Sequence, residues 1–259
     1  MEGYVMSKKI VAKFVNDIYL STSDSLESRF NLFEKYVQQL GFDGVAYTFI
    51  PSFILDNSIG QAPIILHSGQ YPDSLIEQYT NDRLDLSDFA VRQVKENKLS
   101  VIDWRSYQNS NNLSPAEKNV VQIVLHEHGI KNNLTIPTMT GAKGVSGVSV
   151  VSSANDAEFS LLKKERLESL ECITNIFHRS NVDLNEYFVK PYFSNFTPKE
   201  IIILKYLSKG LRLKNIADET TISHSYALNV LSKLRRKLGS ITHDKLMYDL
   251  GVFKILDDH

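Results

Sequence analysis

The sequence predicts a mixed α/β domain, arranged as an α-β-α sandwich around one sheet, followed by a small all-α domain of the helix-turn-helix type. Three observations predict this. Over residues 1–183, segments of strand composition, such as 44–51 and 145–153, alternate with longer amphipathic helical patterns. Over 196–239, three helical patterns follow one another closely. The charge balance also changes sign between the two parts.

The net charge of −1 conceals that change. Residues 196–256 carry 11 Lys+Arg against 5 Asp+Glu, whereas residues 1–195 carry 18 against 23. A basic module beside an acidic larger domain is typical of a nucleic-acid-binding protein that has a separate sensing domain. The acidic balance argues against DNA binding by the first domain itself.

Length and composition set the class of protein. The 259 residues suffice for two domains with their own cores, and 42% hydrophobic with 23% charged residues is typical of a globular protein. The single cysteine, Cys172, excludes an internal disulfide and is expected to be a small buried residue. No apolar run is long enough to cross a bilayer, and the start has no signal-peptide core, so we expect a cytoplasmic protein with no membrane partner.

The elements of the first domain follow from periodicity and end signals. Ser114, Pro115 and Glu117 form a capping signal that begins a helix, and Ser23 or Asp24 is expected to cap an earlier one. Runs of β-branched and aromatic residues predict strands. The expected helices are 8–19, 24–40, 71–80, 86–97, 115–128 and 156–181, and the expected strands are 44–51, 62–68, 99–102, 133–139 and 145–153.

The second domain begins with clear helix signals. Thr197 can cap its first helix, Pro198 suits the first helical position, and Glu200 can complete a capping box. Gly210 ends that helix, and a second, short helix is expected from about residue 212 to 219. A tight turn then leads to a third helix, which is basic. Two helices joined by a tight turn are typical of a helix-turn-helix.

The third helix has an apolar and a polar face. The apolar side chains recur at helical spacing and should pack inward; they are Ala227, Val230, Leu231, Leu234 and Leu238. Short polar and basic side chains on the opposite face suit base edges in a major groove; they are Ser225, Asn229, Ser232, Lys233 and Arg236. Arg235 and Lys237 flank this face and are candidates for phosphate contacts.

A small helical domain with a solvated basic face is the alternative interpretation, because charge runs on isolated helices are usually only solvated. Here a capped helix, a short second helix and a tight turn all precede the basic helix. This agreement between levels favours DNA binding.

Residues 196–256 resemble the DNA-binding domain of LuxR-type regulators. The matching motifs are Thr-Pro-x-Glu from Thr197, Gly210, Ile216-Ala217, Ile222-Ser223 and Arg236-Lys237-Leu238-Gly239. The chain departs from the family pattern at Arg212, at Tyr226-Ala227 and at Leu228. The resemblance implies binding to double-stranded operator DNA as a homodimer, with RNA polymerase as a further partner.

The order of elements over 1–183 is similar to that of the autoinducer-binding domain of the same family, which recognises acyl-homoserine lactones. The resemblance implies that Tyr79 lies near the acyl carbonyl and that Asp88 accepts the ligand amide hydrogen. It also implies that Trp104 lies beside the lactone ring, and that Ser149 can supply a hydroxyl from the last strand.

Three positions of the ligand site depart from the family. Leu75 stands where a tryptophan usually donates to the lactone carbonyl, and leucine has no donor, so that hydrogen bond cannot form. Phe89 replaces a proline and Asn133 replaces a glycine. A different amide or ketone ligand, or a regulator that needs no ligand, therefore stays open.

The same residues suit an acyl amide on chemical grounds alone. A ligand amide in an apolar cavity needs an acceptor for its N–H and a donor for each carbonyl, because an unpaired buried polar group costs about 1–3 kcal/mol. Asp88 can accept, and Tyr79 and Trp104 carry donors on large apolar side chains. Each residue also has an ordinary role, since Asp88 suits a helix start and the aromatics suit a core.

We therefore expect a small-molecule-binding domain at 1–183, a linker at 184–195 and a LuxR-type DNA-binding domain at 196–259. The expected function is a transcription regulator that responds to a small apolar amide, in first place an acyl-homoserine lactone. The alternative is a LuxR-type solo regulator that senses another small molecule or acts without ligand. The long helix 156–181 is expected to serve the core and also the dimer.

Enzyme and metal motifs are missing from the sequence. His126 and His128 lie two residues apart, which would not place them on one face of a helix. No HExxH, Walker loop, GxSxG or GxGxxG occurs. We expect no catalytic residue, no metal ligand and no cofactor beyond the signal molecule. The rival interpretation, an enzyme acting on a small apolar substrate, predicts that a candidate ligand is chemically changed by incubation.

Overall fold

The structure, a computed structural model, describes residues 2–21, 25–55, 62–98, 100–108, 112–181, 189, 196–237 and 239–256. The expected linker, apart from Val189, and the apolar residue Leu238 lie outside the described residues. The chain divides into two compact units, one of Met1–Ile50 and Ala62–Val182 and one of Pro51–Gln61 and Asp183–His259. Across these described ranges, no helix combines the length and the apolar composition of a membrane span.

The first unit is built on a five-stranded sheet with the order β2-β1-β5-β4-β3. Its strands are β1 (Gly44–Pro51), β2 (Ile64–His67), β3 (Ile102–Asp103), β4 (Asn132–Gly141) and β5 (Gly144–Ser152). The pairs β1–β2, β3–β4 and β4–β5 are antiparallel. Gly141 and Gly144 close the β4–β5 hairpin at φ values of 151° and 123°, where a side chain would be strained.

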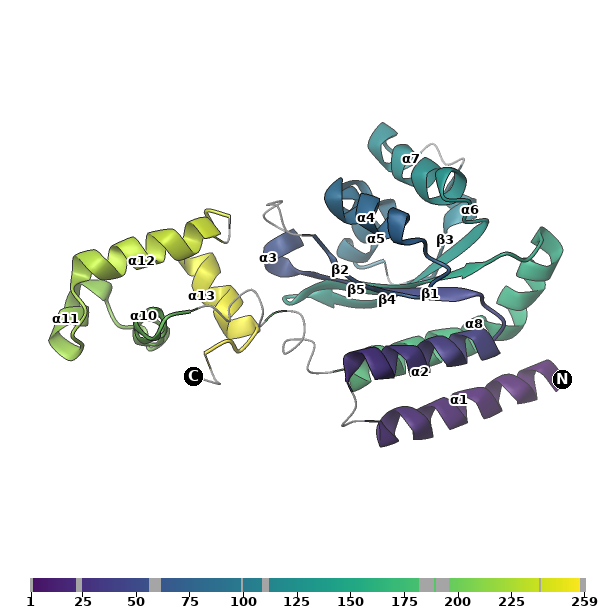
Figure 1. Cartoon of the computed structure of the whole chain (residues 1–259), viewed down its shortest axis with the longest axis horizontal. Helices are drawn as coiled ribbons and strands as arrows, with labels where there is room; N and C mark the ends of the chain where they lie inside the picture. Colours follow the sequence, from purple (N-terminus) through teal and green to yellow (C-terminus); the bar gives the residue numbers. More distant parts are fainter. Residues whose placement is uncertain are drawn as a thin grey trace. The chain divides into compact units, whose positions relative to one another are not determined.

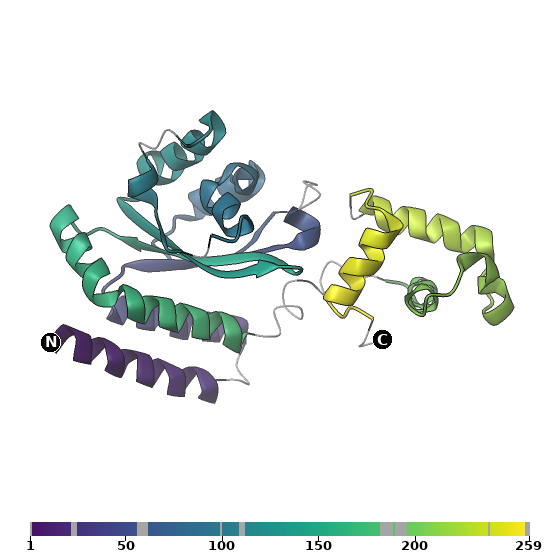
Figure 2. The ribbon, with the colours of Figure 1, turned by 180° about the vertical axis from the view of Figure 1, so that it is seen from behind.

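Helices cover both faces of this sheet (Figure 1, Figure 2). One face carries α1 (Glu2–Leu20), α2 (Leu26–Gln39) and α8 (Asp156–Ser180). The other face carries α4 (Asp73–Asn81), α5 (Phe89–Lys95), α6 (Trp104–Tyr107) and α7 (Pro115–Gln122). A 3-10 turn, η1 (Leu84–Ser87), precedes α5, and a π turn, η2 (Ile123–Glu127), extends α7. This is the mixed helix-and-sheet arrangement that the sequence predicted.

An aromatic core holds α1, α2 and α8 to the sheet. Phe33 of α2 stacks on Phe177 of α8 with 4.4 Å between ring centroids, and Tyr47 of β1 meets Phe177 edge-on at 5.6 Å. Phe14 of α1 meets Tyr36 of α2 edge-on at 5.2 Å. These rings are buried, and burial of each large apolar side chain contributes on the order of 1.5–3 kcal/mol. This side of the sheet is therefore a packed core.

Two capping boxes confirm predicted helix starts. The Ser114 hydroxyl accepts from the backbone N–H of Glu117 at 3.2 Å, and the Glu117 carboxylate accepts from the Ser114 N–H at 2.8 Å. Thr197 and Glu200 make the same pair of bonds at the start of α10 (Pro198–Ser208). Each box satisfies two N–H groups that a helix start would otherwise leave unpaired.

Two details of the first unit differ from expectation. The residue that caps α2 is Ser25, whose side chain accepts from the N–H of Ser28; the expected caps Ser23 and Asp24 lie outside the described residues. Cys172 is exposed on α8, so the expectation of a buried cysteine is wrong. The residues around it show why, because the core side of α8 is taken by Ile173 and Phe177.

The second unit contains short helices. Its described helical elements are α3 (Ser52–Leu55), α10, the 3-10 turn η4 (Leu213–Asn215), α11 (Ile216–Glu219), α12 (His224–Lys237) and α13 (His243–Val252). The α10, α12 and α13 helices pack on one another. The predicted inward residues of α12 that the structure describes are buried; they are Ala227, Val230, Leu231 and Leu234. The sequence reasoning did not include α13, whose Leu246 and Leu250 complete this core.

Candidate functional site

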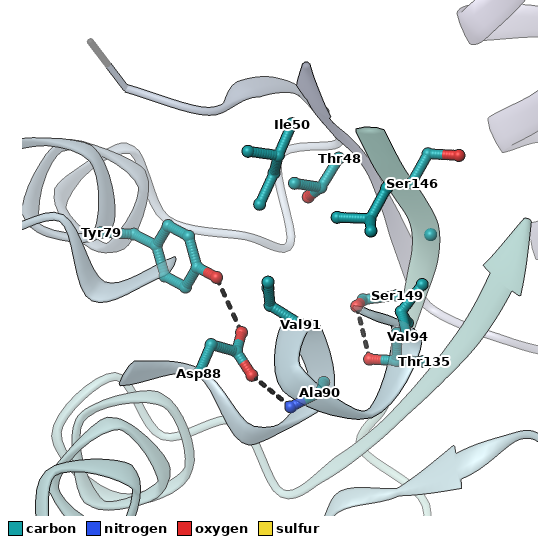
Figure 3. A pocket seen from close by; sticks show the side chains of 12 residues that line it. Thr48, Ile50, Tyr79, Asp88, Ala90, Val91, Val94, Thr135, Ser146 and Ser149 are labelled. Atoms are coloured by element: carbon teal, nitrogen blue, oxygen red, sulfur yellow. Dashed lines mark hydrogen bonds between the residues drawn. The ribbon is translucent and has the colours of Figure 1, made fainter. Parts of the chain in front are cut away.

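A cavity lies between the sheet and the helices α4–α6. It has two adjoining lobes that share Thr48, Tyr79, Asp88 and Ser149. The first lobe is otherwise mainly apolar, with Ile50, Val91 and Val94 in its lining (Figure 3). Val145 also lines this lobe. The second lobe is lined by Leu75, Ile76, Trp104 and Val124 together with Tyr71 and Asn133. Each lobe combines a mostly apolar lining with a few polar groups, which is typical of a small-molecule site.

Tyr79 and Asp88 form a hydrogen-bonded pair where the lobes meet (Figure 3). The Tyr79 hydroxyl, from α4, donates to Oδ2 of Asp88 at 2.7 Å. Oδ1 of Asp88 accepts from the backbone N–H of Ala90 at 2.7 Å, so Asp88 is also the N-cap of α5. The aspartate side chain is thus held at both oxygens by neighbouring elements.

Burial sets the protonation of this pair. Asp88 is only 6% exposed, and burial raises its pKa to about 6, although the hydrogen bonds from Tyr79 and from the backbone N–H groups of Ala90 and Val91 favour the charged form. Burial and the Asp88 charge also raise the pKa of Tyr79 well above its ordinary value. Near pH 7, Asp88 is therefore mostly a charged acceptor and Tyr79 a neutral donor.

A buried ion pair supports the turn before Asp88. Arg83 donates from Nε to Oδ1 of Asp85 at 2.8 Å and from Nη2 to Oδ2 at 2.9 Å. Arg83 lies in the left-handed backbone region, at φ 50°, and Asp85 is 3% exposed. The charge of Asp85 contributes to the raised pKa of Asp88. Sequence reasoning missed this pair, because nothing in the spacing Arg-Leu-Asp distinguishes a buried ion pair from a solvated turn.

The sheet contributes a polar wall. The indole Nε1 of Trp104 donates to Oγ1 of Thr135 at 2.9 Å, and Thr135 shares a hydrogen bond of 2.8 Å with Ser149. Thr135 and Ser149 stand opposite each other in the β4–β5 register. On the same wall, the Tyr71 hydroxyl donates to Oδ1 of Asn133 at 3.1 Å.

The structure brings all but one of the predicted ligand residues to the cavity lining. Those at the lining are Leu75, Tyr79, Asp88, Trp104, Asn133 and Ser149. Phe89 is fully buried behind Trp104, with 4.9 Å between ring centroids, and lines neither lobe. Sequence reasoning missed Thr48, Tyr71 and Thr135. Tyr71 could have been identified from the sequence, because it begins the segment YPDSLIEQY, which also contains Leu75 and Tyr79.

The outer face of α12 carries the predicted polar residues. Exposed side chains on this helix are Ser225, Asn229, Ser232, Lys233, Arg236 and Lys237. Arg235 is half-buried, and its Nε donates to the backbone oxygen of Ile241 at 2.6 Å. Tyr226 and Leu228 are also exposed, at 43% and 49%. The helix therefore presents a mixed polar, basic and apolar surface.

The two histidines considered as metal ligands have separate partners. His128 Nε2 pairs with Oε1 of Gln78 at 2.9 Å, and His126 Nε2 pairs with the side chain of Gln108 at 2.8 Å. Among the described residues, no group of three His, Cys, Asp or Glu side chains is arranged to hold a metal ion.

Comparison with known proteins places this geometry in context. The family model of the autoinducer binding domain matches residues 25–180. A crystal structure of Escherichia coli SdiA is similar over 94% of this chain and 98% of that chain, with 14% identity and a TM-score of 0.53. The fold is thus shared over most of the chain. No curated protein sequence matches.

Two further structures show weaker similarity. SdiA in complex with octanoyl-rac-glycerol covers 94% of this chain and 96% of its own, with 14% identity and a TM-score of 0.48. The N-acylhomoserine lactone dependent LuxR family transcription factor CepR2 from Burkholderia cenocepacia covers 65% of this chain and 95% of its own, with 12% identity and a TM-score of 0.45.

Proposed function

The chain belongs to the family of proteins with an autoinducer-binding domain, and on this premise we propose that it is a ligand-responsive transcription regulator. The proposed signal is a small apolar amide, in first place an acyl-homoserine lactone. The proposed target is operator DNA, bound by a homodimer. The observation that carries the ligand part is the buried Asp88 carboxylate at the junction of two largely apolar lobes.

The pair Tyr79–Asp88 supports an amide in particular. An amide offers one N–H donor and one carbonyl acceptor close together, and the pair offers the matching acceptor and donor. The ligand N–H donates to Asp88. The single hydrogen of the Tyr79 hydroxyl goes to Asp88 in this structure, so it reaches the ligand carbonyl by turning away from Asp88 when the ligand N–H takes its place. Because the carboxylate is buried, such a charge-assisted hydrogen bond is stronger than one between neutral groups. The amide position thereby fixes the ligand between the lobes.

Thermal melting tests this proposal. The purified full chain is melted with acyl-homoserine lactones whose acyl chains run from butanoyl to dodecanoyl. A ligand that binds only the folded state adds about 2.7 kcal/mol of stability at a hundredfold excess over its Kd, so the Tm should rise most for the chain length that fits. No rise with any lactone would contradict the lactone proposal. Recovery of unchanged lactone after incubation separates the regulator from the rival enzyme.

The DNA part of the proposal rests on α11, the turn after it and α12. Ser225, Asn229, Ser232 and Arg236 would face base edges in the major groove. The cations Lys233, Arg235 and Lys237 would contact phosphates. Two copies would then occupy half-sites about one helical turn apart, and RNA polymerase is a further proposed partner. Support comes from the exposed polar face of α12 and the basic charge of residues 196–256.

Selection from random duplex DNA tests the DNA part. Rounds of binding with and without the stabilising lactone should enrich a near-palindromic site. Absence of enrichment in both conditions would contradict DNA binding.

The alternative function is a LuxR-type solo regulator that senses a different small molecule or acts without ligand. Leu75 favours it, because the side chain at this position of the cavity lining has no hydrogen-bond donor. Equal DNA affinity with and without every lactone tested would support this alternative.

A further inference from the structure

Two hydrogen-bonded groups stand on the sheet wall of the cavity. Trp104 donates to Thr135 at 2.9 Å, and Thr135 pairs with Ser149 at 2.8 Å. Beside them, the Tyr71 hydroxyl donates to Oδ1 of Asn133 at 3.1 Å. Burial raises the pKa of Tyr71, so this hydroxyl keeps its proton.

The bond from Tyr71 orients the Asn133 amide. The Tyr71 hydroxyl is the donor and Oδ1 of Asn133 is the acceptor. Of the two polar atoms of an amide side chain, only the oxygen accepts. The amide nitrogen therefore takes no part in this bond.

The amide nitrogen of Asn133 is a donor without a protein acceptor. Asn133 is 2% exposed, yet it lines the second lobe beside Leu75 and Trp104. Among the hydrogen bonds of the described residues, none engages its Nδ2. The donors of Tyr71, Tyr79 and Trp104 already have protein acceptors, and the hydroxyls of Thr48 and Ser149 also lie at the lining. A ligand group placed beside Leu75 and Trp104 therefore meets the Asn133 nitrogen as an available donor.

The two lobes differ in the polar groups that they add to the shared ones. The first lobe adds the hydroxyls of Thr135 and Ser146 among aliphatic side chains. The second lobe adds the Asn133 amide beside Leu75 and Trp104. Because the unpaired nitrogen donor lies in the second lobe, a ligand whose polar end carries an acceptor oxygen is best accommodated with that end in the second lobe and its hydrocarbon chain in the first.

We infer that Asn133 recognises the head group of the signal, by donating from Nδ2 to an acceptor oxygen on that head group. The inference rests on the proposed ligand function and makes it more specific. The ligand is an acyl amide whose N–H is held by Asp88, whose chain fills the first lobe, and whose head group carries a carbonyl. Strand β4 thereby supplies the donor that Leu75 cannot supply.

Matched probe pairs test this inference. Each pair is an N-acyl homoserine lactone and the N-cyclopentyl amide with the same acyl chain, from butanoyl to dodecanoyl. The two probes share the acyl chain, the amide and a five-membered ring, and only the lactone has a head-group carbonyl. Titration calorimetry gives the Kd of both probes for the wild-type full chain and its variants. The wild type should bind the lactone roughly five- to tenfold more tightly, as one hydrogen bond implies.

The variants assign this preference to one side chain. Asn133→Val, which suits a strand, should bring the ratio of the two Kd values close to one. Tyr71→Phe removes the group that orients the amide and should reduce the ratio, which provides a second test if the valine variant does not fold. Leu75→Ala is the matched control: it enlarges the same lobe without changing a donor, so both affinities should shift together and the ratio should stay.

The outcomes separate the two proposals. If the wild type binds both probes but shows no preference for the lactone, or if Asn133→Val and Tyr71→Phe both keep that preference, the inference is overturned and the proposed function stands. If the wild type binds neither probe of any pair, the proposed amide function itself is overturned, and the inference with it.

Discussion

The hydroxyl of Tyr79 donates to Oδ2 of Asp88 across 2.7 Å, and this bond ties α4 to the first turn of α5. The same carboxylate caps α5 by accepting from the N–H of Ala90. Asp88 therefore caps a helix, but burying its charge costs free energy of folding. An amide ligand can reduce this cost, because its N–H donates a further hydrogen bond to the carboxylate.

Asp88→Asn is expected to stabilise the unliganded protein at neutral pH and to abolish the amide response. The folded pKa of Asp88, about 6, lies above the unfolded value of about 3.9, so the native state binds the extra proton between these values. The contribution of Asp88 protonation to the free energy of unfolding, roughly 3 kcal/mol, is therefore complete below about pH 4 and is lost as pH rises through 6. In the variant, the side-chain oxygen of asparagine can still accept from the backbone N–H of Ala90.

Thermal melts of the variant and the wild type between pH 4 and 8 measure this effect. Asp82→Asn is the matched control, because Asp82 is exposed at the end of α4 and undergoes the same change in charge. A full lactone response in Asp88→Asn would remove Asp88 from the role of amide acceptor.

His178 should give a pH dependence of the opposite sign. Its Nδ1 lies 3.1 Å from the Tyr47 hydroxyl, and burial, with a smaller effect of Arg179, lowers its pKa to about 4. A depressed histidine pKa contributes stability that is complete above about pH 6.5 and is lost as pH falls toward 4. Over this window the contributions of His178 and Asp88 to stability oppose each other.

His178→Gln removes one side of this balance. The difference in Tm between the variant and the wild type should therefore rise on acidification from pH 6 to 4, because the variant lacks the loss of stability that protonation of His178 causes. The exposed His126 lies in the same unit, and His126→Gln serves as the control that should keep the wild-type profile. An unchanged difference in Tm between His178→Gln and the wild type over this range would show that His178 does not contribute to the loss of stability in acid.

Trp104 should report ligand binding directly. It is the only tryptophan in the sequence, it is 3% exposed, and it lines the second lobe. A head group that enters this lobe changes the surroundings of the indole, so the emission intensity or wavelength should change with a saturable dependence on ligand. Fluorescence titration measures it, with Trp104→Phe as the blank. Saturable heat in calorimetry without any change in emission would place the ligand outside the second lobe.

Lys233→Gln should weaken DNA binding uniformly. A lysine that contacts a phosphate releases counterions on binding, so its loss should lower affinity for all sequences alike and reduce the slope of log K against log salt by about one. Electrophoretic mobility shifts across a salt series measure both quantities. The control is Lys254→Gln, an exposed lysine beyond α13. An unchanged slope in Lys233→Gln would remove Lys233 from the set of phosphate contacts.

Local signals were sufficient for elements whose ends are chemically marked. The strand predicted at 44–51 matches β1, since its residues combine strand propensity with flanking turns. The capping boxes at Ser114 and Thr197 were visible for the same reason. By contrast, β3 is only Ile102–Asp103, because its pairing with β4 depends on tertiary contacts and not on a run of strand-forming residues.

The cavity could be predicted only in part. Asp88 and Tyr79 stood out as polar groups within amphipathic patterns, and the structure brings them together. The Tyr71–Asn133 bond joins residues 62 positions apart, and no periodicity relates them. Phe89 follows Asp88 directly, yet its side chain points into the packing behind Trp104, because neighbouring residues at a helix start face different directions.

Alternate residues of strand β1 face opposite sides of the sheet. Ala46, Thr48 and Ile50 line the cavity, whereas Tyr47, between them, meets Phe177 in the aromatic core on the other face of the sheet. Selectivity can therefore evolve, or be engineered, without disturbing the scaffold. A library randomised only at positions 46, 48 and 50 would reshape the binding chamber while the opposite layer keeps the protein folded, which makes this strand a natural starting point for biosensors of other small molecules.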